Sequence, residues 1–218
     1  MVLATIDWAT AATFATAVGT LVLAVATFAA VRSANRSARV AEASYLVNLR
    51  PVLVTSRLQD PVQKMRWADD RWTAVEGAQC SVELVDGRIY LAISLRNVGS
   101  GLAVIFGWSV IVGLGTPDIA HTEPDRFRMQ TRDLYTAPGD IGFWQGAIRD
   151  ADDPDYPALS RAIREGAPFT IELLYGDHEG GQRTISRFGL VPHRNTEGEP
   201  KWFPSVSRHW YLDRPDPR

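Results

Sequence analysis

Cysteine is nearly absent from this chain, because Cys80 is the single one in 218 residues. An intrachain disulfide is therefore excluded, and so is a zinc site built from cysteines. A domain that manages without disulfides is typical of a reducing compartment. Cys80 lies among alternating apolar residues, which indicates an inert strand residue rather than a nucleophile. The sequence predicts no metal and no organic cofactor.

Lysine and net charge are also scarce. Of the 23 basic residues only Lys64 and Lys201 are lysines, and the formal net charge is −2. The arginines are spread along the chain rather than clustered. No basic field therefore favours nucleic acid, and no nucleic-acid partner is predicted.

Motifs that carry known chemistries are missing too. The chain has no nucleophile elbow, no P-loop and no HExxH sequence. Gly99-Ser100-Gly101 follows an alternating apolar segment, but the third glycine of a dinucleotide-binding fingerprint is missing and strand-like residues come next. We expect a loop whose glycines permit unusual backbone angles. The sequence therefore predicts a protein that is not an enzyme.

Two polar clusters resemble metal sites. Asp150, Asp152, Asp153 and Asp155 lack the central glycine and the final glutamate of an EF-hand loop. We interpret them as an acidic segment that leads into a short helix and favours its dipole. The consecutive residues Asp177-His178-Glu179 are predicted to form a solvated hairpin tip.

The sequence does contain one long uncharged run, from Trp8 to Val31. At about 1.5 Å per residue this run extends roughly 36 Å, which is enough to cross a bilayer. Residues 1–31 are therefore predicted to be a transmembrane segment. A signal peptide is the alternative, and Ala24-Val25-Ala26 could mimic its cleavage site. That alternative is disfavoured because basic residues are missing before the run and the run is too long.

The charges that flank the run predict its orientation. Arg32, Arg36, Arg39 and Arg50 follow it, against the single acid Glu42, and no basic residue precedes it. Basic flanks stay on the cytoplasmic side. We therefore expect a single-pass protein of the plasma (inner) membrane, with its N-terminus outside and its C-terminal domain in the cytoplasm.

Residues 32–50 are predicted to continue the helix as a juxtamembrane segment, because Gly and Pro are missing until Pro51. Small residues recur on one face at spacings of three and four, and small residues let helices approach closely in lipid. We expect another integral membrane protein to bind a helix-interaction surface made of Ala15, Gly19, Ala34, Ala38, Ala41 and Tyr45. A helix that lies against its own domain is the open alternative.

From Pro51 onward the apolar pattern changes from helical to alternating. Asp86-Gly87 is the signal of a type I′ hairpin turn. Regular short strands with turns between them predict a mainly β fold: an N-terminal transmembrane helix followed by an immunoglobulin-like antiparallel β-sandwich over residues 51–194. The predicted strands are 52–55, 80–85, 89–95, 102–112, 132–137, 141–148, 169–175 and 184–191, with a packed polar loop at 63–78 and a short helix at 159–165.

The last segment, residues 195–218, is predicted to be irregular. It carries four aromatic residues, Trp202, Phe203, Trp210 and Tyr211, among Arg and Pro. Because exposing four aromatic side chains is costly, we expect this tail to pack on the sandwich or on a partner.

Three short motifs follow the N-terminal helix in order: Leu49-Arg50-Pro51-Val52, then the nine residues from Leu95 to Ala103, then Leu174-Tyr175-Gly176-Asp177. This order resembles uncharacterised single-pass bacterial membrane proteins of the actinobacterial type, in which a sandwich domain follows the helix. The resemblance implies a membrane location and a sandwich fold. It brings no catalytic residues.

These features predict a non-catalytic, membrane-anchored accessory or interaction subunit of a bacterial membrane complex. A membrane-tethered sensor of a small molecule or a lipid headgroup is an open alternative, and so is a tethered hydrolase with an unfamiliar site. A buried polar cavity would favour the sensor. An acid, a base and a nucleophile within hydrogen-bond reach would favour the hydrolase.

Overall fold

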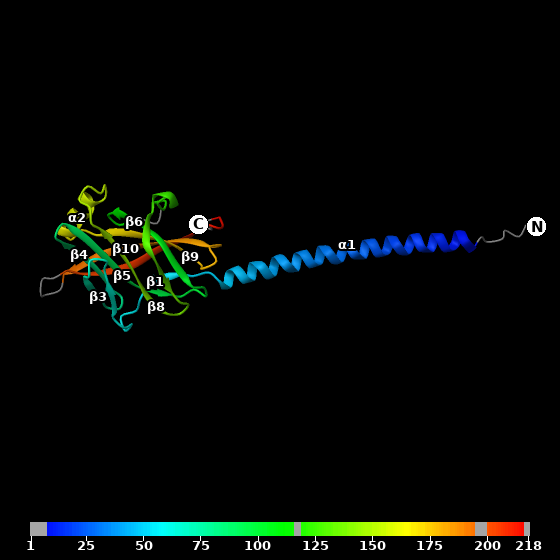
Figure 1. The fold of residues 1–218 in the computed structure, drawn as a ribbon, viewed down its shortest axis with the longest axis horizontal. Coiled ribbons are helices and arrows are strands. Elements are labelled where there is room, and N and C mark those ends of the chain that lie inside the picture. Colours follow the sequence, from blue (N-terminus) through cyan, green and yellow to red (C-terminus); the bar gives the residue numbers. More distant parts are fainter. Residues whose placement is uncertain (1–7, 116–118, 195–199, 216–218) are drawn as a thin grey trace, which may run out of the picture. The chain divides into compact units, whose positions relative to one another are not determined.

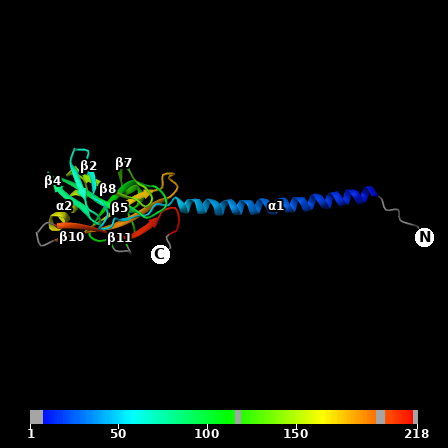
Figure 2. The same cartoon turned by 90° about the horizontal axis from the view of Figure 1, so that it is seen from below.

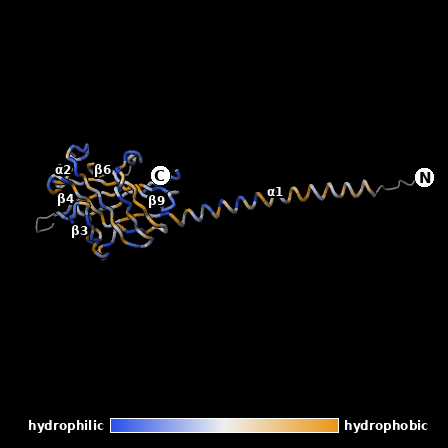
Figure 3. The backbone as a smooth tube through the Cα atoms, viewed as in Figure 1, coloured by the Kyte–Doolittle hydropathy of each residue, from blue (hydrophilic) through white to orange (hydrophobic). Residues whose placement is uncertain are grey.

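The computed structural model describes residues 8–115, 119–194 and 200–215 and divides into two compact units, Met1–Tyr45 and Leu46–Arg218 (Figure 1). The first unit belongs to the helix α1 (Trp8–Asn48). Because Pro is missing from its 41 residues, the predicted transmembrane and juxtamembrane segments form one continuous helix. Its segment Trp8–Leu46 is long and apolar enough to cross a membrane, judged by length and composition, and apolar colouring predominates in its N-terminal part (Figure 3).

The threonines of α1 bond within the helix. The hydroxyls of Thr13, Thr16, Thr20 and Thr27 each donate to the carbonyl four residues earlier, at 2.8–2.9 Å. Such bonds leave no threonine donor unsatisfied in lipid. The moderate hydrophobicity of the run is therefore compatible with a membrane.

The second unit is mainly β, as predicted, and all its strand pairs are antiparallel. Its elements, in chain order, are β1 (Leu53–Thr55), β2 (Gln63–Arg66), β3 (Trp72–Val75), β4 (Cys80–Val85), β5 (Arg88–Asn97), β6 (Ala103–Val112), η1 (Pro124–Arg126), β7 (Arg128–Thr136), β8 (Ile141–Ile148), α2 (Tyr156–Glu165), β9 (Phe169–Gly176), β10 (Arg183–Arg194) and β11 (Pro200–Tyr211).

Nine strands form one sheet in the order β1-β5-β4-β11-β10-β9-β6-β7, with β8 on β5, and β2 and β3 form a separate hairpin. β1 and β4 share one edge of β5, while β8 takes the other edge. A single residue pair, Cys80 with Trp202, connects this half to the half that begins at β11. Inward residues of both halves, such as Leu91 and Leu173, meet in one core. The immunoglobulin-like arrangement of the strands stays a prediction.

The turn between β4 and β5 is as predicted, since Asp86 and Gly87 both have positive φ, 51° and 71°. The prediction of a polar loop at 63–78 is wrong, because this segment contains the hairpin β2–β3. Apolar and polar residues do not alternate regularly in these strands, because Thr73 is buried while Trp72 and Ala74 are exposed. Met65, Trp67 and Val75 nevertheless pack against Tyr90 in a small second core.

The prediction of an irregular tail is also wrong. Residues 200–211 form β11, which pairs with β10 in eleven registered positions and lies along it (Figure 2). The strand was not predicted because it contains proline at positions 200 and 204, and proline is normally excluded from paired strands. The expected packing is confirmed for Trp202 and Trp210, which are buried. The predicted domain boundary at residue 194 therefore falls between two paired strands.

Gly99 and Gly101 were predicted to permit unusual backbone angles, but the structure requires them for another reason. Neither has a positive φ. A Cβ on Gly101 would lie 1.7 Å from the carbonyl oxygen of Leu49, and a Cβ on Gly99 would lie 2.4 Å from that of Arg50. Both residues are therefore required for the close passage of the segment that enters the domain.

Candidate functional site

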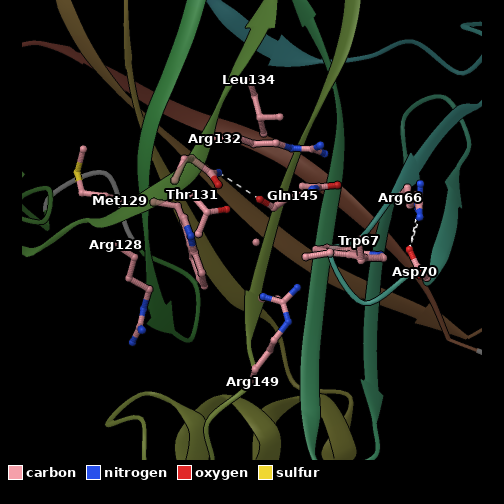
Figure 4. Close-up of a pocket in the computed structure, with 15 residues that line it drawn as sticks. Arg66, Trp67, Asp70, Arg128, Met129, Thr131, Arg132, Leu134, Gln145 and Arg149 are labelled. Atoms are coloured by element: carbon pink, nitrogen blue, oxygen red, sulfur yellow. Dashed lines mark hydrogen bonds and ion pairs between the residues drawn. The ribbon is translucent and has the colours of Figure 1, made fainter.

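A groove of about 550 Å³ opens between β7, β8 and the end of the hairpin β2–β3 (Figure 4). Arg128 and Arg132 lie on the β7 side, Arg66 lies on the hairpin side, and Arg149 lies between them (Figure 4). The groove is an open surface feature. It is lined by four arginines and one acidic residue, Asp70.

An irregularity in β7 shapes one wall. Leu134 pairs with Ile105 and Met129 pairs with Gly107, so that Gln130–Asp133 stand opposite Phe106 alone. A bulge of this kind releases residues from the ladder and redirects their side chains. The Gln130 side chain reaches β8, where its Nε2 donates a hydrogen bond to the main-chain oxygen of Gln145 at 3.1 Å.

The opposite wall is held by aromatic packing. The Trp67 ring meets Tyr90 of β5 edge to face, with ring centroids 5.1 Å apart, and its Nε1 donates to the Thr73 hydroxyl at 2.8 Å. Under the groove, Trp108 and Trp144 make a second edge-to-face pair at 5.3 Å. Such pairs fix ring orientations, so both walls stand on a rigid base.

The arginines differ in how far they are neutralised. Arg128 is paired with Asp153 and Asp155 and its guanidinium lies over Trp108. Arg66 pairs with Asp70, and both side chains are more than half exposed. Such exposed pairs are weak and exchange easily with other anions.

Arg149 and Arg132 are the least neutralised of the four. Arg149 stands 3.9 Å from an oxygen of Asp69, which already accepts a hydrogen bond from the Tyr90 hydroxyl. That bond lowers the pKa of Asp69 despite its partial burial. Arg132 has no carboxylate within ion-pair distance in the described part of the chain. The groove therefore offers exposed guanidinium donors to an anion.

The predicted acidic segment leads into α2, as expected, and its carboxylates also bind an arginine of the groove. Asp155 precedes α2 but its side chain does not cap the helix. Instead Asp153 and Asp155 both bind Arg128. Although burial raises the pKa of Asp153, the hydrogen bonds from Arg128 and from the Asp155 amide outweigh it, so the pKa is lowered overall.

The six predicted helix-interaction residues all lie on α1 and are exposed: Ala15, Gly19, Ala34, Ala38, Ala41 and Tyr45. A Cβ on Gly19 would meet no atom within 4 Å. These residues lie outside the groove, and their role in binding a second helix stays a prediction.

The predicted solvated tip at residues 177–179 is wrong for Asp177, which is buried and accepts a bond from the Gly181 amide at 3.0 Å. His178 and Glu179 are exposed, as expected. Within the described residues, His, Cys, Asp and Glu form no group of three that could hold a metal ion.

One serine and one histidine do meet. The Ser186 hydroxyl lies 2.6 Å from Nδ1 of His209 and 2.8 Å from the Tyr175 hydroxyl. Ser186 and Tyr175 are fully buried, and burial raises the pKa of Tyr175 to about 12. A buried serine cannot reach a substrate, so this chain of bonds serves the core rather than a nucleophilic attack.

The three motifs of the resemblance converge at one end of the domain. The Asn97 side chain accepts bonds from the Val52 and Gly99 amides and donates to the carbonyls of Gly101 and Thr136. The Tyr175 hydroxyl accepts a bond from the Leu53 amide at 3.1 Å. The motifs therefore build the entrance of the chain into the domain, away from the groove.

No family model matches the chain, no curated protein is similar to it, and no solved structure matches it. The fold and the groove alone therefore define the class of protein: a mainly β domain with an arginine-lined surface groove, preceded in the chain by the apolar helix α1. The resemblance to single-pass bacterial membrane proteins stays a prediction.

Sequence reasoning did not identify the groove. The four arginines are far apart in the chain, and all four of their carboxylate partners lie in segments interpreted as a loop or a helix lead-in. A weak signal was available, since Arg128, Gln130 and Arg132 alternate on one strand. Nothing in that alternation indicates the other two arginines, Arg66 and Arg149, which the assembled sheet and hairpin bring to the groove.

Proposed function

We propose that this protein is a non-catalytic, membrane-anchored interaction subunit of a bacterial membrane complex, and that the arginine-lined groove binds an acidic segment of a partner protein. One observation carries the proposal: four arginines line an open groove and one of them, Arg132, has no carboxylate partner in the described residues.

Charge and shape both support this function. Arginine presents a planar set of donors that matches a carboxylate, and it is favoured at interfaces. An open groove with rigid walls suits a segment that lies along it. A buried polar cavity would favour the sensor alternative, whereas the groove is an open feature of the surface.

The binding test uses the full-length protein in detergent micelles and a fluorescein-labelled octapeptide of alternating glutamate and threonine, (Glu-Thr)4. We expect saturable binding that weakens as salt rises, because exposed charge pairs are screened. Replacing both Arg132 and Arg149 by Gln should weaken binding at least about tenfold, which corresponds to roughly 1.4 kcal/mol.

The matched control replaces Arg161 and Arg164 by Gln. These arginines are exposed on α2, and the control removes the same charge outside the groove. If both double variants weaken binding equally, the attraction is a property of the whole surface. If inorganic phosphate binds the groove and (Glu-Thr)4 does not, the small-anion sensor replaces the interaction subunit.

We infer that α1 anchors the protein in the plasma membrane with the domain in the cytoplasm. Arg32, Arg36 and Arg39 on the C-terminal side of the apolar run support this orientation. A membrane-impermeant thiol reagent should label a Thr5→Cys variant in intact cells and a Glu179→Cys variant after lysis alone. Labelling of Glu179→Cys before lysis would reverse the orientation. The native Cys80 is buried and does not interfere.

The helix itself is proposed to bind a helix of another integral membrane protein. In lipid, close packing rather than a hydrophobic reward stabilises helix pairs, and Gly19, Ala34 and Ala38 permit close approach. Replacing these three residues by Leu should leave insertion intact and release the partner, seen as a smaller complex in mild detergent. An unchanged complex size would leave α1 as an anchor alone.

A further inference from the structure

One edge of β8 has no strand partner within the described residues. All eight residues of β8, Ile141–Ile148, pair with β5, and β8 pairs with no second strand. The neighbouring strand β7 pairs with β6 instead. An unpaired edge is a template for another extended chain.

Three hydrogen bonds made by β5 show in which direction each main-chain group of β8 points. The Ser94 amide donates to the carbonyl of Gln79, and the Ser94 carbonyl accepts a bond from the Ser56 amide. The main-chain N–H and C=O groups of even-numbered residues in β5 therefore point toward β4 and β1. The Asn97 amide donates to the carbonyl of Asp140, which precedes β8. The main-chain N–H and C=O groups of odd-numbered residues in β5 therefore point toward β8.

Gln145 stands opposite Ala92, an even-numbered residue of β5. The N–H and C=O groups of Gln145 therefore point away from β5, toward the open edge. Because these groups alternate along a strand, the N–H and C=O of Phe143 and Ala147 point the same way. The bond from Gln130 Nε2 to the Gln145 oxygen, 3.1 Å long, agrees with this direction.

We propose that the acidic partner segment binds as an added β-strand: its main chain pairs with Gln145 and Ala147 on the open edge of β8, and its acidic side chains reach Arg132 and Arg149. This inference rests on the proposed function, since it describes how the same groove takes its partner. The Gln130 side chain holds the position of the incoming amide and withdraws when the segment binds.

Two features of the groove fit an extended segment. The Gln145 side-chain oxygen Oε1 is buried and lacks a donor among the described residues, so an incoming N–H or hydroxyl can satisfy it. From Gln145 to Arg149 the strand rises about 13 Å at roughly 3.3 Å per residue, which matches about four residues of an added strand. Main-chain bonds supply affinity in this mode, and side chains on alternate positions supply selectivity.

The decisive variant is Ala147→Pro in the full-length protein, tested in micelles with (Glu-Thr)4. Proline at position 147 removes one N–H from the open edge of β8. The hydrogen bonds from β8 to β5 stay intact, because the even-numbered residues of β8 make them. We expect at least a tenfold loss of affinity with a melting temperature close to that of the parent. Gln130→Ala, which frees the Gln145 oxygen, should bind at least as tightly as the parent.

A second measurement applies if Ala147→Pro does not fold. Two forms of the octapeptide are compared on the unchanged protein, one N-methylated at every glutamate amide and the other at every threonine amide. In an extended segment these amides point to opposite edges, so one form should bind and the other should fail.

The outcomes separate the two proposals. Equal binding of both methylated forms and of the unmodified peptide overturns strand addition while the acidic docking site stands. No binding of (Glu-Thr)4 at all overturns the proposed function. Binding of vesicles that contain phosphatidylglycerol, in competition with the peptide and lost in the Arg132→Gln/Arg149→Gln variant, assigns the groove to a lipid surface and overturns both.

Discussion

Arg50 and Asp213 form a two-point ion pair between the start and the end of the β domain. Nη1 of Arg50 lies 3.0 Å from Oδ1 of Asp213, and Nη2 lies 2.5 Å from Oδ2. The same guanidinium lies over the Tyr211 ring, 4.4 Å from its centroid. The segment that enters the domain is thus fastened to the end of β11, 163 residues later in the chain.

Asp213→Asn should lower stability at neutral pH by about 1 kcal/mol, as for a well-oriented pair that is partly exposed. Although burial raises the pKa of Asp213, the hydrogen bonds and charge of Arg50 outweigh it, so the pKa lies below the ordinary 3.8. A lowered carboxyl pKa stabilises the fold above pH 3.8, and this stabilisation is lost as the pH falls through the folded-state value. The difference between parent and variant should therefore be constant above about pH 5 and shrink below pH 4.

The measurement is thermal unfolding of both proteins in micelles between pH 2.5 and pH 7. Asp125→Asn, which removes an exposed carboxylate, is the control and should differ little from the parent at any pH. A difference for Asp213→Asn that grows as the pH falls would contradict the pairing.

The two faces of β11 should differ in their contribution to stability. Trp202 is buried, with its ring 5.3 Å from that of Phe169, whereas its neighbour Phe203 is 36% exposed. Trp202→Ala should cost about 3–5 kcal/mol, as for other buried aromatic residues, and Phe203→Ala less than about 1 kcal/mol. Denaturant unfolding followed by near-ultraviolet circular dichroism compares them. Equal costs would mean that β11 does not pack as described.

Strands that obey the alternation rule were predictable from the sequence, and strands with another source of stability were not. β8 was predicted to the residue, because its inward side chains are Trp144, Ile148 and small residues and its neighbours supply the turn. β11 contains two prolines, and its stability comes from pairing with β10 over eleven positions. That information belongs to the partner strand and is missing from the local sequence.

The groove was not predictable for a related reason. Its position depends on the register slip in β7 and on β8 having one partner, and both are properties of the assembled sheet. The helix-interaction surface, in contrast, was predicted from spacing alone, because the period of a helix indicates which residues share a face, and its role in binding stays a prediction. Spacing says which residues lie together, but not what they bind.

Two buried threonines should respond in opposite directions to the same substitution. The Thr184 hydroxyl is buried and has no hydrogen-bond partner among the described residues. Thr184→Val removes that unsatisfied group at nearly constant shape and should stabilise the fold by about 1 kcal/mol. Thr170 donates to the Gly113 carbonyl and accepts from the Gly115 amide. Thr170→Val should therefore cost about 1–3 kcal/mol.

Denaturant midpoints of the two valine variants, measured side by side, check this prediction. A loss of stability in Thr184→Val comparable to that in Thr170→Val would show that the Thr184 hydroxyl has a partner in solution, such as an ordered water molecule.

Among the polar contacts of the domain, the ion pair between Glu172 and Arg187 should be the one whose disruption lowers stability most. Both side chains are fully buried, and Nε and Nη2 of Arg187 lie 2.8 and 2.7 Å from Oε1 of Glu172. Arg187 also donates to the carbonyls of Ile119 and Ala120, while Oε2 of Glu172 accepts the Thr122 amide. The pair thus fastens the segment before β7 onto the outer face of β9 and β10.

Arg187→Met should cost about 3–5 kcal/mol, because it leaves the Glu172 carboxylate buried without its countercharge. The double variant Glu172→Leu/Arg187→Met removes both charges and should recover part of this loss, since two apolar side chains can replace a buried pair at similar volume. Hydrogen exchange should show faster exchange of the Thr122 amide in both variants, because its acceptor is disturbed in one and gone in the other. If the double variant is less stable than Arg187→Met, the cost arises from lost contacts with the loop carbonyls and not from an isolated charge.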